Sequence, residues 1–131
     1  MFLHIEPSDH LAIYDQVVRQ IKFSVASGAI QPGEFVASVR ELARDLAINP
    51  NTVSRAYRQL QDDGVLESVR GTGLAVAQGA PARCRRERIE LIGERIEQAL
   101  SEGRQSQLSR TEMEQLVTKQ LANVYQGEAQ R

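Results

Sequence analysis

The chain has 131 residues, of which 41% are hydrophobic and 25% charged, and its 16 basic and 17 acidic side chains give a net charge of −1. This length fits one or two small domains and leaves no room for a large enzyme. The composition excludes a disordered chain and a membrane protein, and the small net charge argues against a protein that coats nucleic acid.

We expect neither a targeting signal nor a covalent crosslink within the chain. Residues 1–15 carry acidic groups such as Glu6 instead of a basic patch before an apolar stretch, so we expect no signal peptide and a cytoplasmic location. Cys84 is the single cysteine, which excludes an intrachain disulfide and a thiolate cluster for zinc. His4 and His10 lack the spacing of paired metal ligands, so we expect no metal and no other cofactor.

The first predicted helix ends at Gly28. Ser8 and Asp9 are residues that cap helices, and apolar residues follow them at i, i+3, i+4, i+7 and i+11, on one face. These apolar residues are Tyr14, Val17, Val18, Ile21 and Val25. A Pro-Gly turn then marks a short connector, whose Ile30 and Phe35 we expect to pack on the core.

Two more helices are predicted in close succession. Ser38 and Glu41 have the spacing of a capping box, in which each side chain binds a backbone N–H of the other residue, at the start of a short helix. After a two-residue break, Asn49 is a good N-cap, and Pro50 occupies the first helical position, where its missing N–H costs nothing. The apolar residues of this third helix share one face; they are Val53, Ala56, Tyr57 and Leu60.

A short β-hairpin is predicted after the third helix. Gly64 ends the helix, and residues 65–69 and 74–77 have the pattern of two strands. The turn between them consists of Arg70, Gly71, Thr72 and Gly73. Three helices followed by a hairpin are the order of a winged helix.

A different pattern begins after residues 78–81, where glycine, proline and small residues predict a boundary. A helix over about 82–102 follows, with a narrow seam of the coiled-coil kind, and Gly103 is predicted to interrupt it. Ser109 and Glu112 repeat the capping-box spacing before a last helix with one apolar stripe. Two such helices bury little surface alone, so we expect them to pack on the first domain, on each other and on a second chain.

Residues 38–60 have the plan of a helix-turn-helix, whose second helix enters the DNA major groove by its N-terminal residues. Residues 38–61 carry four arginines against two acidic side chains, a local charge of +2. Arginine can bind guanine bidentately and asparagine can bind adenine, whereas serine and threonine more often bind phosphate. The residues that we expect on the DNA side are Arg40, Asn49, Asn51, Thr52, Ser54, Arg55 and Arg58.

The predicted hairpin suits a wing that touches the minor groove or the backbone, with Arg70 at its tip and Gly71 and Gly73 permitting close approach. Taken by itself, the polar face of the third helix is typical of a solvated surface, and the hairpin is typical of an ordinary tight turn. The combination of the two favours DNA binding. The alternative function is a winged helix that docks an acidic or polar protein partner, which the net charge of −1 favours. The sequence contains no catalytic triad, carboxylate pair or phosphate-binding loop that would support an enzyme.

The motifs together resemble one family. The run SVRELARDLAINPNTVSRAYRQL over residues 38–60, followed by RGTG over 70–73, closely resembles the GntR family of bacterial transcriptional regulators. IYDQ over 13–16 adds to the resemblance, which covers roughly residues 13–76. It implies that DNA is bound by Arg40, Asn49, Asn51, Thr52, Ser54 and Arg55, with Arg70, Gly71 and Thr72 in the wing. Ala12 and Ala37 stand where the family often has proline, which affects backbone rigidity more than contacts.

The C-terminal part resembles the YtrA subfamily, because roughly fifty residues can hold neither of the large domains that most relatives carry. The resemblance implies a homodimer formed through the last two helices, and genes that often accompany those of ABC transporters. The interface residues that it implies are Ile89, Ile92, Ile96, Leu100, Met113, Leu116, Val117 and Leu121. The alternative is that these helices pack within one chain only.

Cys84 lies among arginines, and two hypotheses about its thiol follow. Neighbouring guanidinium groups could lower the pKa of the thiol and make a redox sensor, and the alternative is an incidental thiol. Arg83, Arg85, Arg86 and Arg88 fit either contacts to DNA phosphates or Arg–Glu pairs along a solvated helix.

The sequence thus predicts a mainly α-helical fold with a small β-hairpin. Residues 1–77 form a winged helix-turn-helix DNA-binding domain, 78–81 a linker, and 82–131 a helical dimerisation domain. The expected function is repression of transcription by a homodimer on a pseudo-palindromic double-stranded DNA operator. Whether a small-molecule effector binds stays open, and no membrane contact is expected.

Overall fold

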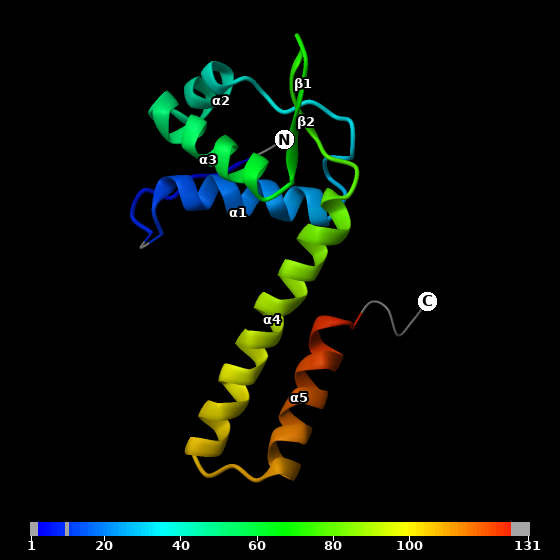
Figure 1. Ribbon diagram of the computed structural model, residues 1–131. Helices are drawn as coiled ribbons and strands as arrows, with labels where there is room; N and C mark the ends of the chain where they lie inside the picture. Colours follow the sequence, from blue (N-terminus) through cyan, green and yellow to red (C-terminus); the bar gives the residue numbers. More distant parts are fainter. Residues whose placement is uncertain (1–2, 10, 127–131) are drawn as a thin grey trace. The chain divides into compact units, whose positions relative to one another are not determined.

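The computed structural model describes residues 3–9 and 11–126. The elements in these residues are α1 (Ile13–Ala26), α2 (Val39–Leu46), α3 (Pro50–Asp62), β1 (Leu66–Val69), β2 (Gly73–Val76), α4 (Ala80–Gln105) and α5 (Arg110–Val124) (Figure 1). They divide into two compact units, Met1–Ile89 and Glu90–Arg131. The predicted fold class, mainly helical with one small hairpin, is confirmed.

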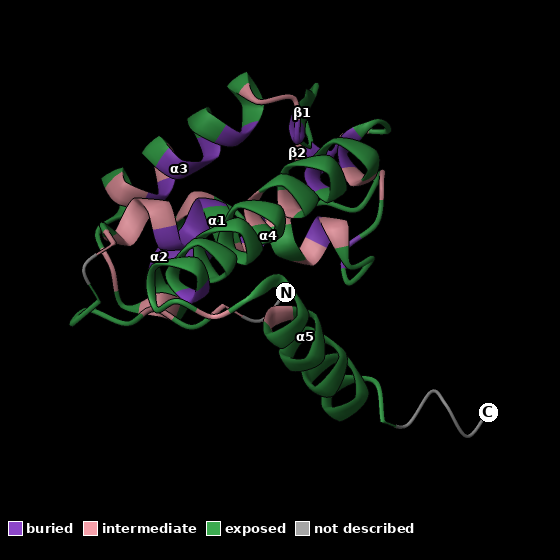
Figure 2. Cartoon of the chain, turned by 90° about the horizontal axis from the view of Figure 1, so that it is seen from below, coloured by how far each residue is buried: buried purple, intermediate pink, exposed green. Residues whose placement is uncertain are grey.

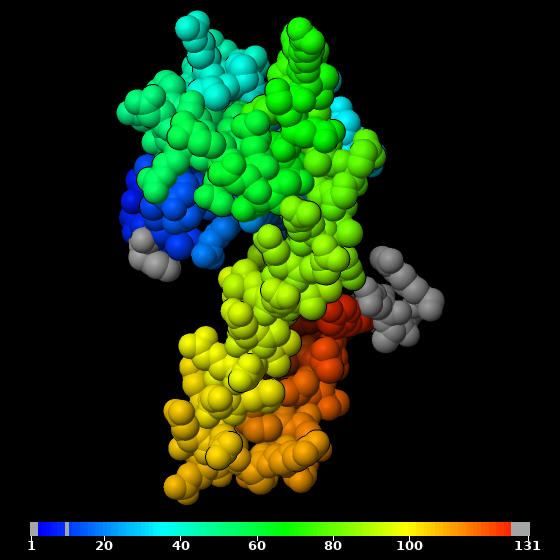
Figure 3. Space-filling model, viewed as in Figure 1, coloured from blue at the N-terminus to red at the C-terminus, as the bar shows by residue number. Residues whose placement is uncertain are grey.

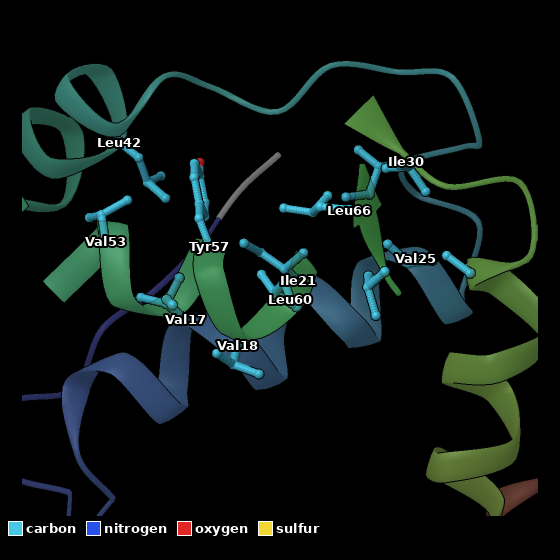
Figure 4. Packing of buried hydrophobic residues seen from close by; sticks show 14 of the residues in the cluster. Val17, Val18, Ile21, Val25, Ile30, Leu42, Val53, Tyr57, Leu60 and Leu66 are labelled. Carbon is cyan, nitrogen blue, oxygen red and sulfur yellow. The ribbon is translucent and has the colours of Figure 1, made fainter. Parts of the chain in front are cut away.

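The core of the first unit lies between α1, α2, α3 and the hairpin, and the apolar stripes of the first three helices meet in it (Figure 4). Both α1 and α2 pack against α3. The side chains that are buried without measurable exposure include Val17, Ile21, Val25, Val53, Leu60, Val65 and Val76. The helical spacing of the sequence therefore predicted the inward faces correctly, with Tyr14 half-buried at the edge of the core.

The start of α1 differs from the prediction that Ser8 and Asp9 cap it. The N-cap is Ala12, whose side chain makes no capping bond, and Asp9 Oδ1 accepts a hydrogen bond from the backbone N–H two residues later, at 3.0 Å. The buried side chain of Gln16 holds the preceding segment instead. Its amide oxygen accepts a bond from the N–H of Glu6 at 2.8 Å, and its nitrogen donates to two carbonyls of that segment.

The two strands pair antiparallel, with Leu66 opposite Val76 and Val69 opposite Gly73. The connector before α2 runs alongside β2, because the N–H of Val36 donates to the carbonyl of Leu74 at 2.9 Å and Phe35 bridges to Ala75. Successive residues of an extended segment point to opposite faces. The prediction that Phe35 packs on the core is therefore wrong, since its side chain is 49% exposed, whereas Ile30 is buried as predicted.

The helix α4 begins at Ala80, within the segment of small residues after the hairpin. Ala80 and Cys84 are buried in the core of the first unit. The first turns of α4 are thus packed as part of that core, and the division into two units falls further along the helix, after Ile89.

In the second unit, the sequence predicts that Gly103 interrupts the helix. This prediction is wrong, because α4 continues through Gly103 to Gln105. Gly103 is buried, and a Cβ at this position would overlap the Sδ of Met113 on α5. The chain reverses after Gln107, which has a φ of 66°. The capping box of Ser109 and Glu112 at the start of α5 is confirmed. Glycine here leaves room for the side chain of Met113 and does not mark a helix end.

Candidate nucleic-acid interface

The helix-turn-helix begins with a capped α2. Ser38 Oγ accepts a hydrogen bond from the N–H of Glu41 at 3.1 Å and donates one to Glu41 Oε1, also at 3.1 Å. The N-cap prediction is confirmed, but the carboxylate binds the Ser38 hydroxyl in place of the backbone N–H of the expected capping box. This cap determines where α2 starts, and Arg40 follows in its first turn with an exposed side chain.

A tight turn joins α2 to α3. Ala47 adopts the left-handed conformation, with φ 55° and ψ 46°, which residues with a Cβ rarely adopt. Asn49 then caps α3, since its Oδ1 accepts a hydrogen bond from the N–H of Asn51 at 2.8 Å, and Pro50 is the first helical residue, both as predicted. The N-terminal end of α3 carries the partial positive charge of the helix dipole, which favours a nearby phosphate.

The face of α3 opposite the core carries the polar residues that the sequence singled out. Asn49, Asn51, Arg55 and Arg58 are exposed, and Thr52 and Ser54 are half-buried at the sides. The structure therefore brings these residues together on one side of α3. It leaves their hydrogen-bonding groups at the surface, where base edges and phosphates can reach them.

The polar face includes one contact that the sequence analysis missed. The guanidinium carbon of Arg55 lies 3.8 Å from the centre of the Tyr14 ring. Tyr14 was assigned only to the apolar stripe of the first helix. No spacing rule connects residues that lie on different helices, so the sequence contains no local signal for this pair.

Tyr57 ties α3 to the segment before α2. Its hydroxyl donates a hydrogen bond to the carbonyl of Ala37 at 2.7 Å. Burial raises the pKa of Tyr57 well above its ordinary value of about 10, and the Glu41 carboxylate raises it further. The hydroxyl therefore stays protonated and donating at neutral pH.

The predicted wing forms the tip of the hairpin. Arg70, Gly71, Thr72 and Gly73 are all exposed, and the N–H of Thr72 donates to the carbonyl of Val69 at 3.0 Å. Gly71 has a φ of 77°, a conformation that glycine adopts at no steric cost. Figure 3 shows the green hairpin tip protruding from the surface of the first unit. Its backbone is thus accessible to a large ligand such as a duplex.

Two of the arginines near Cys84 fasten α4 to the first unit. Arg83 donates a hydrogen bond to the carbonyl of Asp63 at the end of α3. The Arg88 guanidinium lies 5.0 Å from the centre of the Phe23 ring on α1. The sequence had indicated neither of these two contacts. Arg85 and Arg86 are exposed on α4.

Cys84 itself is 2% exposed. Burial raises the pKa of its thiol, and the nearby carboxylates of Glu87 and Asp63 act in the same direction, against the lowering by Lys22 and Arg83. A redox sensor needs an accessible thiolate. The structure thus favours the incidental, buried thiol.

The apolar stripes of the last two helices are largely uncovered. The residues of the implied interface with large exposed side chains, between 41% and 56%, are Ile89, Ile92, Ile96, Leu100, Leu116, Val117 and Leu121. Met113 is half-buried beside Gly103. In Figure 2, α5 is exposed along almost its whole length. Soluble monomers rarely expose so many large apolar side chains in one small unit.

Other kinds of site receive no support from residues 3–9 and 11–126. Among these residues, no three His, Cys, Asp or Glu side chains are grouped so that they could hold a metal ion. His4 is highly exposed, and His10 lies outside the described residues. Within the same described ranges, no helix is sufficiently long and apolar to span a bilayer.

Comparison with known proteins agrees with this geometry. A family model described as "Bacterial regulatory proteins, gntR family" matches residues 13–76. The HTH-type transcriptional repressor YtrA of Bacillus subtilis is 35% identical over 98 residues, which cover 75% of this chain and 75% of YtrA. A match of this length cannot fit within the winged helix and therefore extends into α4.

Two solved structures have a similar fold. A transcriptional regulator from Oenococcus oeni matches with a TM-score of 0.80 and 26% identity, over 92% of this chain and 99% of that one. The DNA-binding domain of AraR, in complex with operator ORX1, matches with a TM-score of 0.51 and 29% identity, over 58% of this chain and 100% of that one. The AraR domain, which has a similar fold, thus binds an operator.

Proposed function

The chain belongs to the GntR family of bacterial transcriptional regulators, and we propose that it is a homodimeric repressor that binds a pseudo-palindromic DNA operator. One observation carries the proposal. The capped recognition helix α3 buries one face in the core and presents Asn51, Arg55 and Arg58 on the other. A polar helix face of this kind, beside an exposed wing, fits the major groove and the adjacent backbone.

The proposed DNA contacts divide into two kinds. Arg40, Asn51 and Arg55 carry the side chains that can distinguish bases. The hydroxyls of Thr52 and Ser54 and the helix end at Asn49 suit phosphates. The remaining proposed contacts come from Arg58 on α3 and from the wing, residues Arg70, Gly71, Thr72 and Gly73.

The dimer is proposed from the uncovered apolar stripes of α4 and α5. A second copy of the chain has the same apolar stripes. Two copies related by a two-fold axis would therefore bury the stripes of both chains against each other. In the proposed dimer the two copies of α3 bind one duplex, with half-sites about one helical turn apart. In terms of domains, we propose that residues 1–77 bind DNA and 82–131 dimerise, joined by 78–81.

The test is binding of the purified protein to labelled DNA from upstream of its own gene, at several salt concentrations and against unrelated competitor DNA. We expect tight, competitor-resistant binding that protects two half-sites and weakens steeply with salt, because bound phosphates release counterions. Arg40→Ala and Arg55→Ala should each cost about 1–3 kcal/mol and relax base preference at one position. An equal loss on all sequences would assign that residue to phosphate.

The matched control is Arg110→Ala. It also removes one positive charge, but from α5, where Arg110 pairs with Glu114 at 2.9 Å. It should leave DNA affinity unchanged. Weak binding that is equal on all sequences would contradict the proposal and favour the winged helix as a docking module for a protein partner.

The dimer has a separate test by sedimentation or light scattering. Ile92→Glu and Ile96→Glu place charges in the exposed stripe, and should give a folded monomer with reduced operator affinity. Gln98→Glu adds the same charge to α4 on the side away from the stripe and should stay dimeric. A dimer that survives both stripe substitutions would mean that another surface forms the interface.

The subfamily supports two finer proposals. The regulated genes should include those of an ABC transporter, which footprinting and transcript levels in a deletion strain would test. The protein should act in the cytoplasm, where its operator lies. Unchanged transporter transcripts in the deletion strain would overturn the first of these.

A further inference from the structure

Tyr14 provides a fixed aromatic surface next to the recognition helix. It lies in the first turn of α1, is half-buried and packs against the hydrophobic core. Arg55 lies in the second turn of α3 and is exposed. The guanidinium carbon is 3.8 Å from the ring centre, which is the distance of a cation–π contact.

This contact places the guanidinium carbon over the ring and uses none of the N–H donors in a hydrogen bond. The five N–H donors of arginine lie in the guanidinium plane. Within the described part of the chain, Arg55 has no partner besides the ring. The side chain is therefore held in place while the donors that bind guanine or phosphate remain unused.

We propose that Tyr14 is a positioning residue for DNA recognition, which holds Arg55 ready to donate hydrogen bonds to the operator. The inference rests on the proposed function. A free arginine side chain loses much rotational freedom when it binds, and this loss weakens binding. A side chain already restrained by the ring loses less. Tyr14 thus raises operator affinity through Arg55, without touching the DNA itself.

The positioning role is separable from core packing by the choice of variant. Tyr14→Leu keeps an apolar side chain at the edge of the core but removes the aromatic face. Tyr14→Phe keeps the face and removes only the hydroxyl. The matched control is Phe23→Leu, which removes another α1 ring under an arginine, Arg88, that has no proposed role in DNA binding.

The experiment measures operator affinity in a double-mutant cycle with Arg55→Ala. Tyr14→Leu should weaken operator binding about two- to five-fold, as expected for an exposed cation–π contact. Tyr14→Phe and Phe23→Leu should bind as tightly as the parent. In the Arg55→Ala background, Tyr14→Leu should have no further effect, because the group that the ring positions is gone.

Three results would overturn the inference. If Tyr14→Leu weakens binding equally with and without Arg55, the ring acts through the fold. If Tyr14→Phe is as weak as Tyr14→Leu, the hydroxyl contacts DNA directly. If Arg55→Ala weakens binding but Tyr14→Leu does not, the stacking has no role, while the proposed function still holds.

A measurement without DNA tests the contact independently. The NMR signal of the Arg55 Nε–H should show a ring-current shift that Tyr14→Phe keeps and Tyr14→Leu abolishes. Absence of this shift in the parent would overturn the inference. If the parent protein binds no DNA sequence specifically, the proposed function fails, and the positioning role for Tyr14 fails with it even where the shift is present.

Discussion

The ammonium group of Lys22 on α1 lies 2.8 Å from the carboxylate of Asp63, the C-cap residue of α3. It also lies 3.0 Å from the carboxylate of Glu87 on α4. Burial by itself lowers the pKa of Lys22, but the hydrogen bonds and charges of Asp63 and Glu87 together raise it above its ordinary value. One ammonium group thus joins three helices of the first unit.

Lys22→Met should destabilise the first unit by about 1–2 kcal/mol, because it leaves two carboxylates without their shared cation in a partly buried place. Since folding raises the pKa of Lys22, its stabilisation is complete below the ordinary value of 10.5 and is lost as pH rises through the higher folded value. Urea unfolding of the parent and of Lys22→Met at pH 7 and pH 11 would measure the destabilisation and its dependence on pH. The difference from the parent should shrink at pH 11.

Lys119→Met, an exposed lysine on α5, is the control for Lys22→Met and should change the free energy of unfolding little at either pH. A difference between Lys22→Met and the parent that stays the same at pH 11 would show that the ion pairs are not its source.

Tyr57→Phe should cost about 0.5–1.5 kcal/mol, because it removes the hydrogen bond to the Ala37 carbonyl while keeping the ring in the core. The raised pKa of Tyr57 means that the unfolded chain loses this proton first as pH increases. The parent should therefore lose stability above about pH 10, and Tyr57→Phe should lose less. The measurement is the free energy of unfolding of the parent and of Tyr57→Phe as a function of pH, with absorbance to follow formation of the phenolate. If both proteins lose the same stability above about pH 10, the predicted role of the Tyr57 hydroxyl is wrong.

Gly103→Val should destabilise the α4–α5 hairpin by about 1 kcal/mol, at the low end for overpacking, because the added side chain overlaps the thioether of Met113, which ends a flexible side chain and can partly move aside. The same substitution in a Met113→Ala background should cost much less, since the overlapping group is gone. Thermal unfolding of the four proteins completes the cycle. Equal costs in both backgrounds would indicate a backbone effect in place of an overlap.

Cys84 should react slowly with a thiol reagent in the native protein and rapidly in urea, because its side chain is buried and burial raises the pKa of the thiol. The labelling rate should follow the fraction of unfolded protein. Rapid native labelling near pH 8 would contradict the buried position and restore the redox-sensor hypothesis.

The sequence by itself determined the features that depend on residues within one or two helical turns. Ser38 and Asn49 cap their helices as predicted, and the 3.6-residue period identified the buried faces of α1 and α3. The polar face of α3 followed from the same period. These predictions succeed because backbone capping and amphipathic spacing involve near neighbours along the chain.

The tertiary structure alone decided the contacts between distant segments. It placed Tyr14 under Arg55, drew Gln16 to the segment before α1, and put Gly103 beside Met113. It also turned Phe35 outward, because pairing with β2 set the direction of its side chain. Such contacts depend on how whole elements pack, and a pattern of near neighbours contains no record of which distant element will lie opposite.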